Sequence, residues 1–313
     1  MVRKWTIKKA ILDIPNDRSS HTIPTPRGGG IAIALVWFIS LLILKLTDNI
    51  ENQLFFALLS GAPLSFAGFL DDVLHLKAKT RFLIQFFCAG LALFSLGGLH
   101  VVDLGFYSFE NSWLLTLLAF IGIIWLTNLF NFLDGIDGYI STEVIFIGIA
   151  TFLLLNDCMA LLLSVIVLGF LFWNWQKAKI FMGDVGSTLL GFTIAIFAIY
   201  QQNNELSSIL IWIMLTSLFW VDATVTLMRR YWNKEQLSQA HRKHAYQRIV
   251  QSGFSHQKTV LYSLSLNLLA LFLIICAIHF KSLMLVFACL NILILWFTIK
   301  WVDKRKPFEK NAR

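Results

Sequence analysis

The sequence predicts an all-α polytopic membrane protein, with about ten transmembrane helices in a single integral membrane domain over residues 1–313. Hydrophobic residues make up 57% of the chain and charged residues only 14%, whereas soluble proteins carry about 25% charged residues. Ten apolar runs approach the roughly 20 residues that a helix needs to cross the hydrocarbon core of a bilayer. A mean hydropathy of +0.70 also excludes a disordered chain, because disorder requires little apolar surface.

The expected transmembrane helices follow one another with mostly short connections. They cover residues 31–46, 54–70, 82–99, 113–130, 140–155, 159–173, 187–200, 208–228, 259–278 and 283–299. The connections alternate between two sides, and one side holds 24 of the 26 Lys and Arg residues, while the other holds only Lys45 and Lys281. Because basic loops stay in the cytoplasm, the side that is rich in Lys and Arg is expected to be cytoplasmic. The net charge of +8 thus has a topological origin, and no nucleic-acid partner is expected.

The sequence gives no indication of a secretory signal peptide, an internal repeat or a set of paired cysteines. No secretory signal peptide is expected, because residues 1–9 are basic but no apolar run follows before Ile31. No internal repeat of the kind found in many transporters is visible. The four cysteines lie in or beside apolar runs without paired spacing, which indicates small core residues.

Polar residues are costly inside a membrane, so their positions are informative. Four clusters converge on the cytoplasmic side of the predicted topology. They are residues 68–72 after the second span, 128–138 after the fourth, 182–187 before the seventh, and 241–248 in the long cytoplasmic loop 229–258. A further polar segment, residues 25–30, precedes the first span. This convergence predicts one functional site at the cytoplasmic face.

The first cluster is the adjacent pair Asp71 and Asp72, which follows a long apolar run. Two like charges this close oppose each other's ionisation, so either one of them holds its proton more tightly or a cation offsets both. A solvated helix end would explain the pair by itself. The pair therefore indicates a site only in combination with the other clusters.

The fourth span ends in oxygen-bearing side chains that recur every three residues: Asn128, Asn131, Asp134 and Asp137. On a helix this spacing makes one polar stripe. Gly135 and Gly138 are expected to end the helix and to let a ligand approach the backbone. Amides that bridge helices are the structural alternative, but four such side chains within ten residues favour a functional use.

Residues 182–187, Met-Gly-Asp-Val-Gly-Ser, place Asp184 between two glycines just before the seventh span. Free N–H groups at a helix start favour anions, while Asp184 could hold a hard cation that faces them. A simple N-cap by Asp184 is the structural alternative. Lys177 and Lys179, just upstream, add positive charge.

The loop 229–258 carries seven Lys or Arg and three His. The count alone fits the positive-inside pattern, but the dense run from residue 241 to residue 248 suits a diphosphate. Arg offers a bidentate fork to phosphate oxygens, and His can donate a hydrogen bond to them. The residues expected to take part are His241, Arg242, His244 and Arg248. Asp222, in the preceding span, is expected to be structural and to pair with the cations of this loop.

The segment before the first span reads Thr-Pro-Arg-Gly-Gly-Gly at residues 25–30. Its three glycines can expose successive backbone N–H groups to an anion, and Arg27 adds a positive charge. A flexible linker is the alternative. The position of the segment on the same face as the other clusters favours binding.

Basic groups, carboxylates that suit a hard metal and exposed N–H groups at a membrane surface predict a site for phosphate esters and Mg2+. A lipid phosphate could place its head group there, and a soluble nucleotide derivative would arrive from the cytoplasm. A transporter or channel for an anionic lipid or sugar is the alternative, but it would need polar groups along a path through the membrane. A CDP-alcohol phosphotransferase is disfavoured, because its run of aspartates is absent.

These motifs, in this order and spacing, resemble the polyprenyl-phosphate N-acetylhexosamine-1-phosphate transferase superfamily, bacterial glycosyltransferase family 4, over nearly the whole chain. The resemblance rests on residues 24–30, 71–72, 128–138, 182–187 and the histidine-containing loop. It implies transfer of an N-acetylamino-sugar-1-phosphate from a UDP-sugar to undecaprenyl phosphate, with release of UMP, in the bacterial inner membrane. The implied metal is Mg2+, with Mn2+ as an alternative, and a homodimer is an open alternative for the assembly.

The resemblance also implies roles for individual residues. The implied metal ligands are Asn131 and Asp184, and Asp71 and Asp72 would orient or deprotonate the lipid phosphate. The nucleotide pocket is expected around Asp134 and Asp137, and the diphosphate at His241, Arg242 and His244. The implied catalytic residues are Asp71, Asp72, Asp134, Asp137, His241 and His244. Together with the residue patterns above, we expect five residues to bind substrate: Arg27, Asn128, Lys179, Arg242 and Arg248.

Two departures from the family pattern bear on the branch. The loop reads His-Arg-Lys-His where the branch that makes the peptidoglycan precursor has consecutive histidines, which favours the branch that initiates O-antigen or capsule synthesis. Relatives usually carry one more span before the Pro-rich segment, and this sequence does not contain it. We expect that this difference removes none of the proposed site residues. UDP-GlcNAc, UDP-FucNAc and UDP-QuiNAc stay open as donors.

Overall fold

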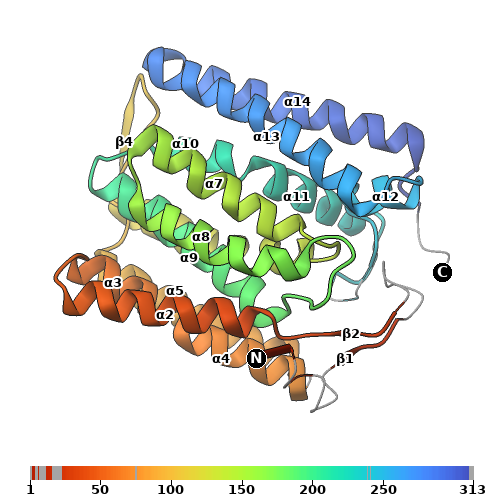
Figure 1. Ribbon diagram of the computed structural model, residues 1–313. Helices are drawn as coiled ribbons and strands as arrows, with labels where there is room; N and C mark the ends of the chain where they lie inside the picture. Colours follow the sequence, from red (N-terminus) through yellow and green to blue (C-terminus); the bar gives the residue numbers. More distant parts are fainter. Residues whose placement is uncertain are drawn as a thin grey trace.

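The computed structural model describes residues 2–3, 6, 12–15, 23–74, 76–237, 239 and 241–309, and this part of the chain is a bundle of helices (Figure 1). The helices are α2 (Gly30–Leu46), α3 (Asn52–Leu59), α4 (Ala62–Leu74), α5 (Ala78–Leu96), α6 (Ser112–Leu133), α7 (Tyr139–Leu155), α8 (Cys158–Asn174), α9 (Asp184–Asn203), α10 (Ile209–Leu215), α11 (Ser217–Trp232), α12 (Ala245–Gln251), α13 (His256–His279), the 3-10 helix η1 (Lys281–Leu283) and α14 (Met284–Arg305). The strands of the described part are short, so the predicted helical class is confirmed.

The strands form two antiparallel pairs at opposite ends of the bundle (Figure 1). Strand β1 (Leu12–Asp13) pairs with β2 (Thr25–Pro26), and β3 (Val101–Asp103) pairs with β4 (Ser108–Glu110). We call the end where α4 and α6 finish and α9 begins the polar end, and the end that carries β3 and β4 the hairpin end. The pair of β1 and β2 lies at the polar end.

Length and composition identify the membrane spans. Six helical stretches in the described residues are long and apolar enough to cross a membrane, and α10 with α11, bent by 72°, makes a seventh if the pair is one span. The helices α2, α7 and α8 have 17 residues each. At 1.5 Å per residue they are about 25 Å long, slightly less than the roughly 30 Å of hydrocarbon. The chain is thus a multi-pass membrane protein, and the count of ten spans stays a prediction.

Each predicted apolar run nevertheless coincides with a helix or with two helices in succession. Several helices continue beyond their apolar run at the polar end, where α4 reaches Leu74, α11 reaches Trp232 and α14 reaches Arg305. Hydropathy marks only the part of a helix inside the hydrocarbon, whereas backbone hydrogen bonding continues into the interface. The polar side chains of the predicted site therefore lie on helix ends.

Helix α9 forms the centre of the bundle and is buried along almost its whole length. Glycines allow its neighbours to pack directly on its backbone. A Cβ added to Gly191 would lie 2.5 Å from Leu126 O of α6, and one added to Gly68 of α4 would lie 2.6 Å from Val185 N. Small residues are the usual means of close helix packing in membranes. This packing brings the ends of α4 and α6 against the start of α9.

Candidate active site

The packing at the polar end assembles an aspartate cluster, which we define as Asp71, Asp72, Asn131, Asp134 and Asp184. The Asn131 amide, on α6, donates to Asp184 Oδ1 at 2.9 Å and contacts Ser187 Oγ at 3.2 Å. These contacts join α6 to α9, and the close packing of Gly68 on Val185 brings the end of α4 beside them. The structure therefore brings together the two residues that the sequence analysis assigned to a metal.

Arg81 joins this cluster and was not among the predicted site residues. Its Nη1 lies 2.8 Å from Asp71 Oδ2 and 3.3 Å from Asp184 Oδ2, and its side chain is 40% exposed. In the sequence it is the last of three cations, after Lys77 and Lys79, ahead of an apolar run, and the positive-inside pattern explains such a group by itself. Its position at the start of α5, beside the end of α4, provides the partially exposed positive charge that a phosphate site needs.

Gly183 determines where the Asp72 carboxylate lies. Its backbone has φ +74° and ψ 177°, a conformation that is open almost only to glycine. A Cβ at this position would stand 2.6 Å from Asp72 Oδ2. The close approach of the Asp72 carboxylate to the start of α9 thus depends on the absence of a side chain at residue 183.

Asp134 follows the last residue of α6 and is half-buried. Burial, together with the negative charges of Asp184 and Asp72, raises the pKa of Asp134 to about 7. A carboxyl group in such surroundings ionises more readily when a cation is bound nearby. The electrostatics of the cluster therefore favour a bound cation.

The donor set fits Mg2+, although it is not a complete protein cage. Among the described residues, no group of three or more His, Cys, Asp or Glu side chains is arranged to hold a metal by itself. Mg2+ usually takes one or two carboxylates together with substrate phosphates and water. Asp72 Oδ2 is buried without a hydrogen-bond partner in the described structure. Asn131 could offer its oxygen to a cation shared with Asp184 only if its amide turns over, because its nitrogen faces Asp184 here.

Asp137 faces a different space from Asp134. Its Oδ2 accepts from Ala178 N at 3.2 Å and lies 3.3 Å from His256 Nδ1. It borders a cavity of about 410 Å3, which we call the polar cavity. The charged and imidazole side chains that line it are Arg3, Asp137, Lys177, Lys179 and His256. Asp134 and Asp137 were expected in one pocket, and His256 was not among the predicted site residues.

The prediction that Gly135 and Gly138 let a ligand approach the backbone is not supported by their surroundings. A Cβ on Gly135 would lie 2.2 Å from Tyr246 Oη, and one on Gly138 would lie 3.0 Å from the Trp175 ring. Gly138 also has φ +75°. Side chains of the protein occupy the space that these glycines leave, because the turn between α6 and α7 packs against two other segments.

The prediction that the glycine run exposes successive N–H groups to an anion is wrong for two of its three residues. Gly29 N donates to Phe181 O at 2.9 Å, and Gly30 N donates to Met182 O at 2.8 Å. These hydrogen bonds attach the chain before α2 to the segment before α9. Arg27 lies beside them, pairs with Asp13 at 2.9 Å, and keeps 39% of its side chain exposed.

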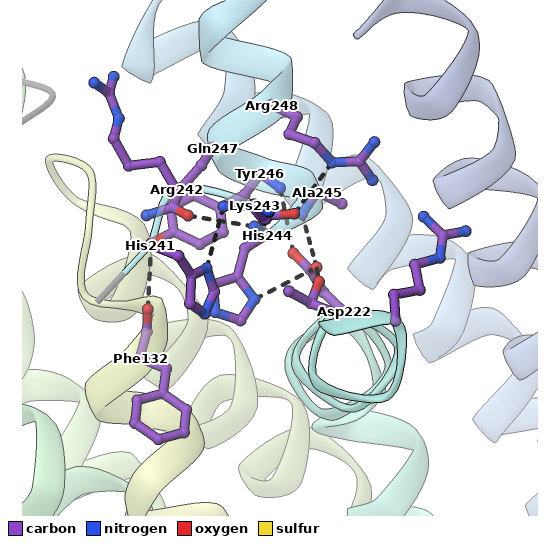
Figure 2. A network of polar contacts seen from close by, with 12 residues as sticks. Phe132, Asp222, His241, Arg242, Lys243, His244, Ala245, Tyr246, Gln247 and Arg248 are labelled. Atoms are coloured by element: carbon purple, nitrogen blue, oxygen red, sulfur yellow. Dashed lines mark hydrogen bonds and ion pairs between the residues drawn. The ribbon is translucent and has the colours of Figure 1, made fainter. Parts of the chain in front are cut away.

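The second part of the site is the histidine loop, which we define as residues 241–248 (Figure 2). Asp222 of α11 accepts hydrogen bonds from Ala245 N at 2.7 Å and from Tyr246 N at 3.2 Å. Its Oδ1 lies 3.7 Å from His244 Nδ1. The expectation that Asp222 pairs with this loop is confirmed, although its partners are backbone N–H groups and a histidine.

The two histidines of the loop have different surroundings. His244 is buried, with 2% of its surface exposed, whereas His241 is half-buried. Burial and then the neighbouring positive groups, His244 first, lower the pKa of His241 to about 3. His241 is therefore neutral at physiological pH.

Arg248, expected to bind substrate, has partners inside the protein. Its Nη1 donates to Asp303 Oδ1 at 2.7 Å and to Lys306 O at 2.9 Å, and only 3% of the side chain is exposed. Arg229 donates to both oxygens of Asp303 at 2.8 and 2.9 Å. Asp303, near the end of α14, thus binds both the end of α11, through Arg229, and the end of the histidine loop, through Arg248. A phosphate contact by Arg248 stays a prediction.

Other predicted residues also have internal contacts. The Asn128 amide exchanges hydrogen bonds with Gln85 of α5, at 2.7 and 3.2 Å, which matches the structural alternative of amides that bridge helices. Arg242 O accepts from Gln251 at 2.7 Å, and the Lys179 ammonium lies 5.7 Å from the centre of the Trp173 ring. The proposed substrate contacts of these three residues stay predictions.

Comparison with known proteins provides an independent observation. A family model described as glycosyl transferase family 4 matches residues 54–202, the segment that contains the whole aspartate cluster. The chain is 31% identical to the probable undecaprenyl-phosphate N-acetylglucosaminyl 1-phosphate transferase of Bacillus subtilis, over 99% of this chain and 90% of that protein. It is 30% identical to the undecaprenyl-phosphate alpha-N-acetylglucosaminyl 1-phosphate transferase of Yersinia pestis, over 87% and 78% of the two chains. It is 27% identical to the decaprenyl-phosphate N-acetylglucosaminephosphotransferase of Mycobacterium leprae, over 79% and 72%.

Proposed function

The chain belongs to the polyprenyl-phosphate N-acetylhexosamine-1-phosphate transferases of glycosyl transferase family 4, and on this premise we propose that it transfers an N-acetylamino-sugar-1-phosphate from a UDP-sugar to undecaprenyl phosphate. The observation that carries this proposal is the aspartate cluster, which three helices assemble at one end of a membrane bundle. The polar cavity and the histidine loop lie at the same end and supply cationic and hydrogen-bonding groups.

The acceptor phosphate is expected at Asp71 and Asp72. This pair lies at the polar end of α4, where the head group of a membrane lipid can reach it while the lipid tail stays in the bilayer. Arg81, 2.8 Å from Asp71, supplies the positive charge that draws a phosphate there. A phosphate dianion is already nucleophilic near neutral pH, so orientation by these residues contributes more than removal of a proton.

The donor nucleotide is expected in the polar cavity, with its diphosphate directed toward the aspartate cluster and the histidine loop. A volume of about 410 Å3 falls in the usual range for ligand pockets. Lys177 and Lys179 line this cavity. Asp137 lines it too, and Asp137 belongs to the same turn as Asp134. This turn connects the nucleotide site to the reacting centre.

The reaction forms one P–O bond and breaks another. An oxygen of the lipid phosphate bonds to the β-phosphorus of the UDP-sugar, the bond from that phosphorus to the bridging oxygen breaks, and UMP leaves with the bond electrons. Arg81 would neutralise phosphate oxygens, and His241 would donate a hydrogen bond to them. Mg2+, held by Asp184 with Asn131, would offset the negative charge of the phosphates.

The relatives are named for N-acetylglucosaminyl transfer, which supports UDP-GlcNAc as the first donor to test. The basic charge of the polar end supports a cytoplasmic orientation of this end in a bacterial inner membrane. The resulting lipid-linked sugar would initiate O-antigen or another cell-surface polysaccharide.

The direct test is UMP release by the purified protein from undecaprenyl phosphate and a panel of UDP-GlcNAc, UDP-FucNAc and UDP-QuiNAc, with Mg2+ or with EDTA. We expect UMP release with one donor, and we expect EDTA to abolish it. Folded protein that releases no UMP from any donor would contradict the proposed reaction. Full activity in EDTA would contradict the proposed dependence on Mg2+.

A further inference from the structure

We propose that Asp222 is a positioning residue that holds the histidine loop so that His241 presents its Nε2–H to the donor diphosphate. The inference rests on the proposed function, because it takes the donor to be a nucleotide diphospho-sugar. Asp222 itself would not touch the substrate. It would act through the backbone of α12 and through His244.

The Asp222 carboxylate is buried and fully occupied by hydrogen-bond donors. Only 6% of the residue is exposed, and it accepts two backbone N–H groups at the start of α12, those of Ala245 and Tyr246. Thr226 Oγ donates to it as well, at 3.1 Å. A buried carboxylate with three donors is held rigidly, and N–H groups left without an acceptor in the interior are strongly unfavourable. Asp222 therefore determines where α12 begins.

A short path of contacts leads from Asp222 to His241. The buried His244 ring stands between them, with Nδ1 3.7 Å from Asp222 and with its ring centre 4.8 Å from that of His241 (Figure 2). His241 Nδ1 accepts a hydrogen bond from Lys243 N at 3.2 Å. An imidazole whose Nδ1 accepts must carry its proton on Nε2 when it is neutral. The loop thus selects the tautomer with an Nε2–H donor.

The histidine loop also contacts the turn that carries Asp134 and Asp137. Tyr246 donates to Phe132 O at 3.4 Å, and its hydroxyl fills the space next to Gly135. Its ring stacks on Tyr139 with centres 4.8 Å apart. Since Asp222 accepts from the Tyr246 N–H, one carboxylate holds both the histidines and this contact with the turn.

The chain offers a matched control at the hairpin end. Asp157 also accepts two backbone N–H groups at a helix start, those of Met159 at 2.9 Å and Ala160 at 3.0 Å, and a third donor, Gln201, at 2.7 Å. Asp157→Asn removes the same kind of capping charge as Asp222→Asn, but from the opposite end of the bundle. The control separates lost stability from lost positioning.

The kinetic test compares both variants with the wild-type protein in UMP release. We expect Asp222→Asn to raise the KM for the UDP-sugar roughly 10- to 100-fold and to change the KM for undecaprenyl phosphate less than threefold. Asp157→Asn should leave both KM values within twofold. A merely structural role for Asp222 predicts equal effects on both substrates, and that result would overturn the proposal.

A double-mutant cycle tests whether Asp222 acts through His241. His241→Gln keeps an N–H donor but removes the imidazole. If the path is correct, Asp222→Asn adds little to the KM of the His241→Gln protein, whereas residues that act independently give additive effects. Additivity would refute the path through His241.

A spectroscopic test does not depend on turnover. In 15N-histidine-labelled protein, the signal of His241, assigned by its loss in His241→Gln, should show the Nε2–H tautomer at pH 7. Asp222→Asn should mix the two tautomers, and Asp157→Asn should not. An Nδ1–H tautomer in the wild-type protein would disprove the proposal. A wild-type protein with the expected spectrum but no UMP release would instead count against the proposed function.

Discussion

Replacing Gly183 with alanine is expected to push the Asp72 carboxylate out of the aspartate cluster. The new Cβ would stand 2.6 Å from Asp72 Oδ2 and 3.2 Å from Oδ1, where ordinary contacts begin at 3.4 Å. The carboxylate would have to retreat by about 0.8 Å, the difference between 3.4 and 2.6 Å. The backbone adds a second penalty, because φ +74° with ψ 177° costs a residue with a side chain about 1–3 kcal/mol.

The expected effects of Gly183→Ala follow from these two values. A displacement near 1 Å at a reacting centre can lower the rate about 100-fold, so we expect a loss of that size in kcat for UMP release. The free energy of unfolding should fall by about 1–3 kcal/mol. The assay is UMP release at saturating donor and acceptor, together with thermal unfolding of the same preparation.

Gly90→Ala is the matched control, because a Cβ on Gly90 of α5 would meet nothing within 4 Å. Alanine is favoured over glycine in a helix by about 1 kcal/mol, so this variant should be unchanged or slightly more stable, with wild-type kcat. If Gly183→Ala keeps its activity within threefold of the wild type, the Asp72 carboxylate does not depend on this contact and the reasoning fails.

Three further predictions use other parts of the site. Asp184→Asn removes one charge and little volume, so UMP release should fall at least about 100-fold while membrane insertion is retained; activity within a few-fold of the wild type would exclude a role as metal ligand. The pKa of His241 is lowered to about 3, below the value of about 6.5 in the unfolded chain, so its contribution to stability is fully present above pH 6.5 and is lost as the pH falls toward 3. Lowering the pH from 7.5 to 5.5 should therefore destabilise the wild type more than His241→Gln, as measured by thermal unfolding. Equal changes in melting temperature with pH for the two proteins would contradict this. In a background without the four native cysteines, an impermeant thiol reagent should label Lys177→Cys only from the cytoplasmic side and Glu110→Cys only from outside; the reverse pattern would invert the orientation.

Much of the fold follows from local sequence patterns. An apolar run must form a helix in lipid, because every backbone polar group there has to be satisfied within its own segment. The positions of the helices were therefore predictable to within a few residues. The bend between α10 and α11 was not, since both parts are apolar and hydropathy carries no information about direction.

The site was predictable where residues lie together in the sequence and less so where contacts join distant segments. The members of the aspartate cluster were identified from short motifs. Arg81 was missed because it follows Lys77 and Lys79, and a group of basic residues beside a span has a topological explanation. Gly29 and Gly30 were misinterpreted because their backbone partners, Phe181 and Met182, are about 150 residues away.

The sequence by itself determined that this protein spans a membrane, which family it resembles, and which carboxylates and histidines are candidates for chemistry, because composition and short motifs are local properties. Only the tertiary structure decided how these candidates divide. Asp134 and Asp137 face different spaces because α6 ends at Leu133. Arg248 turns to Asp303 at the end of the last helix. Which group faces substrate and which holds another in place depends on packing between segments far apart in the chain, and no local pattern records that packing.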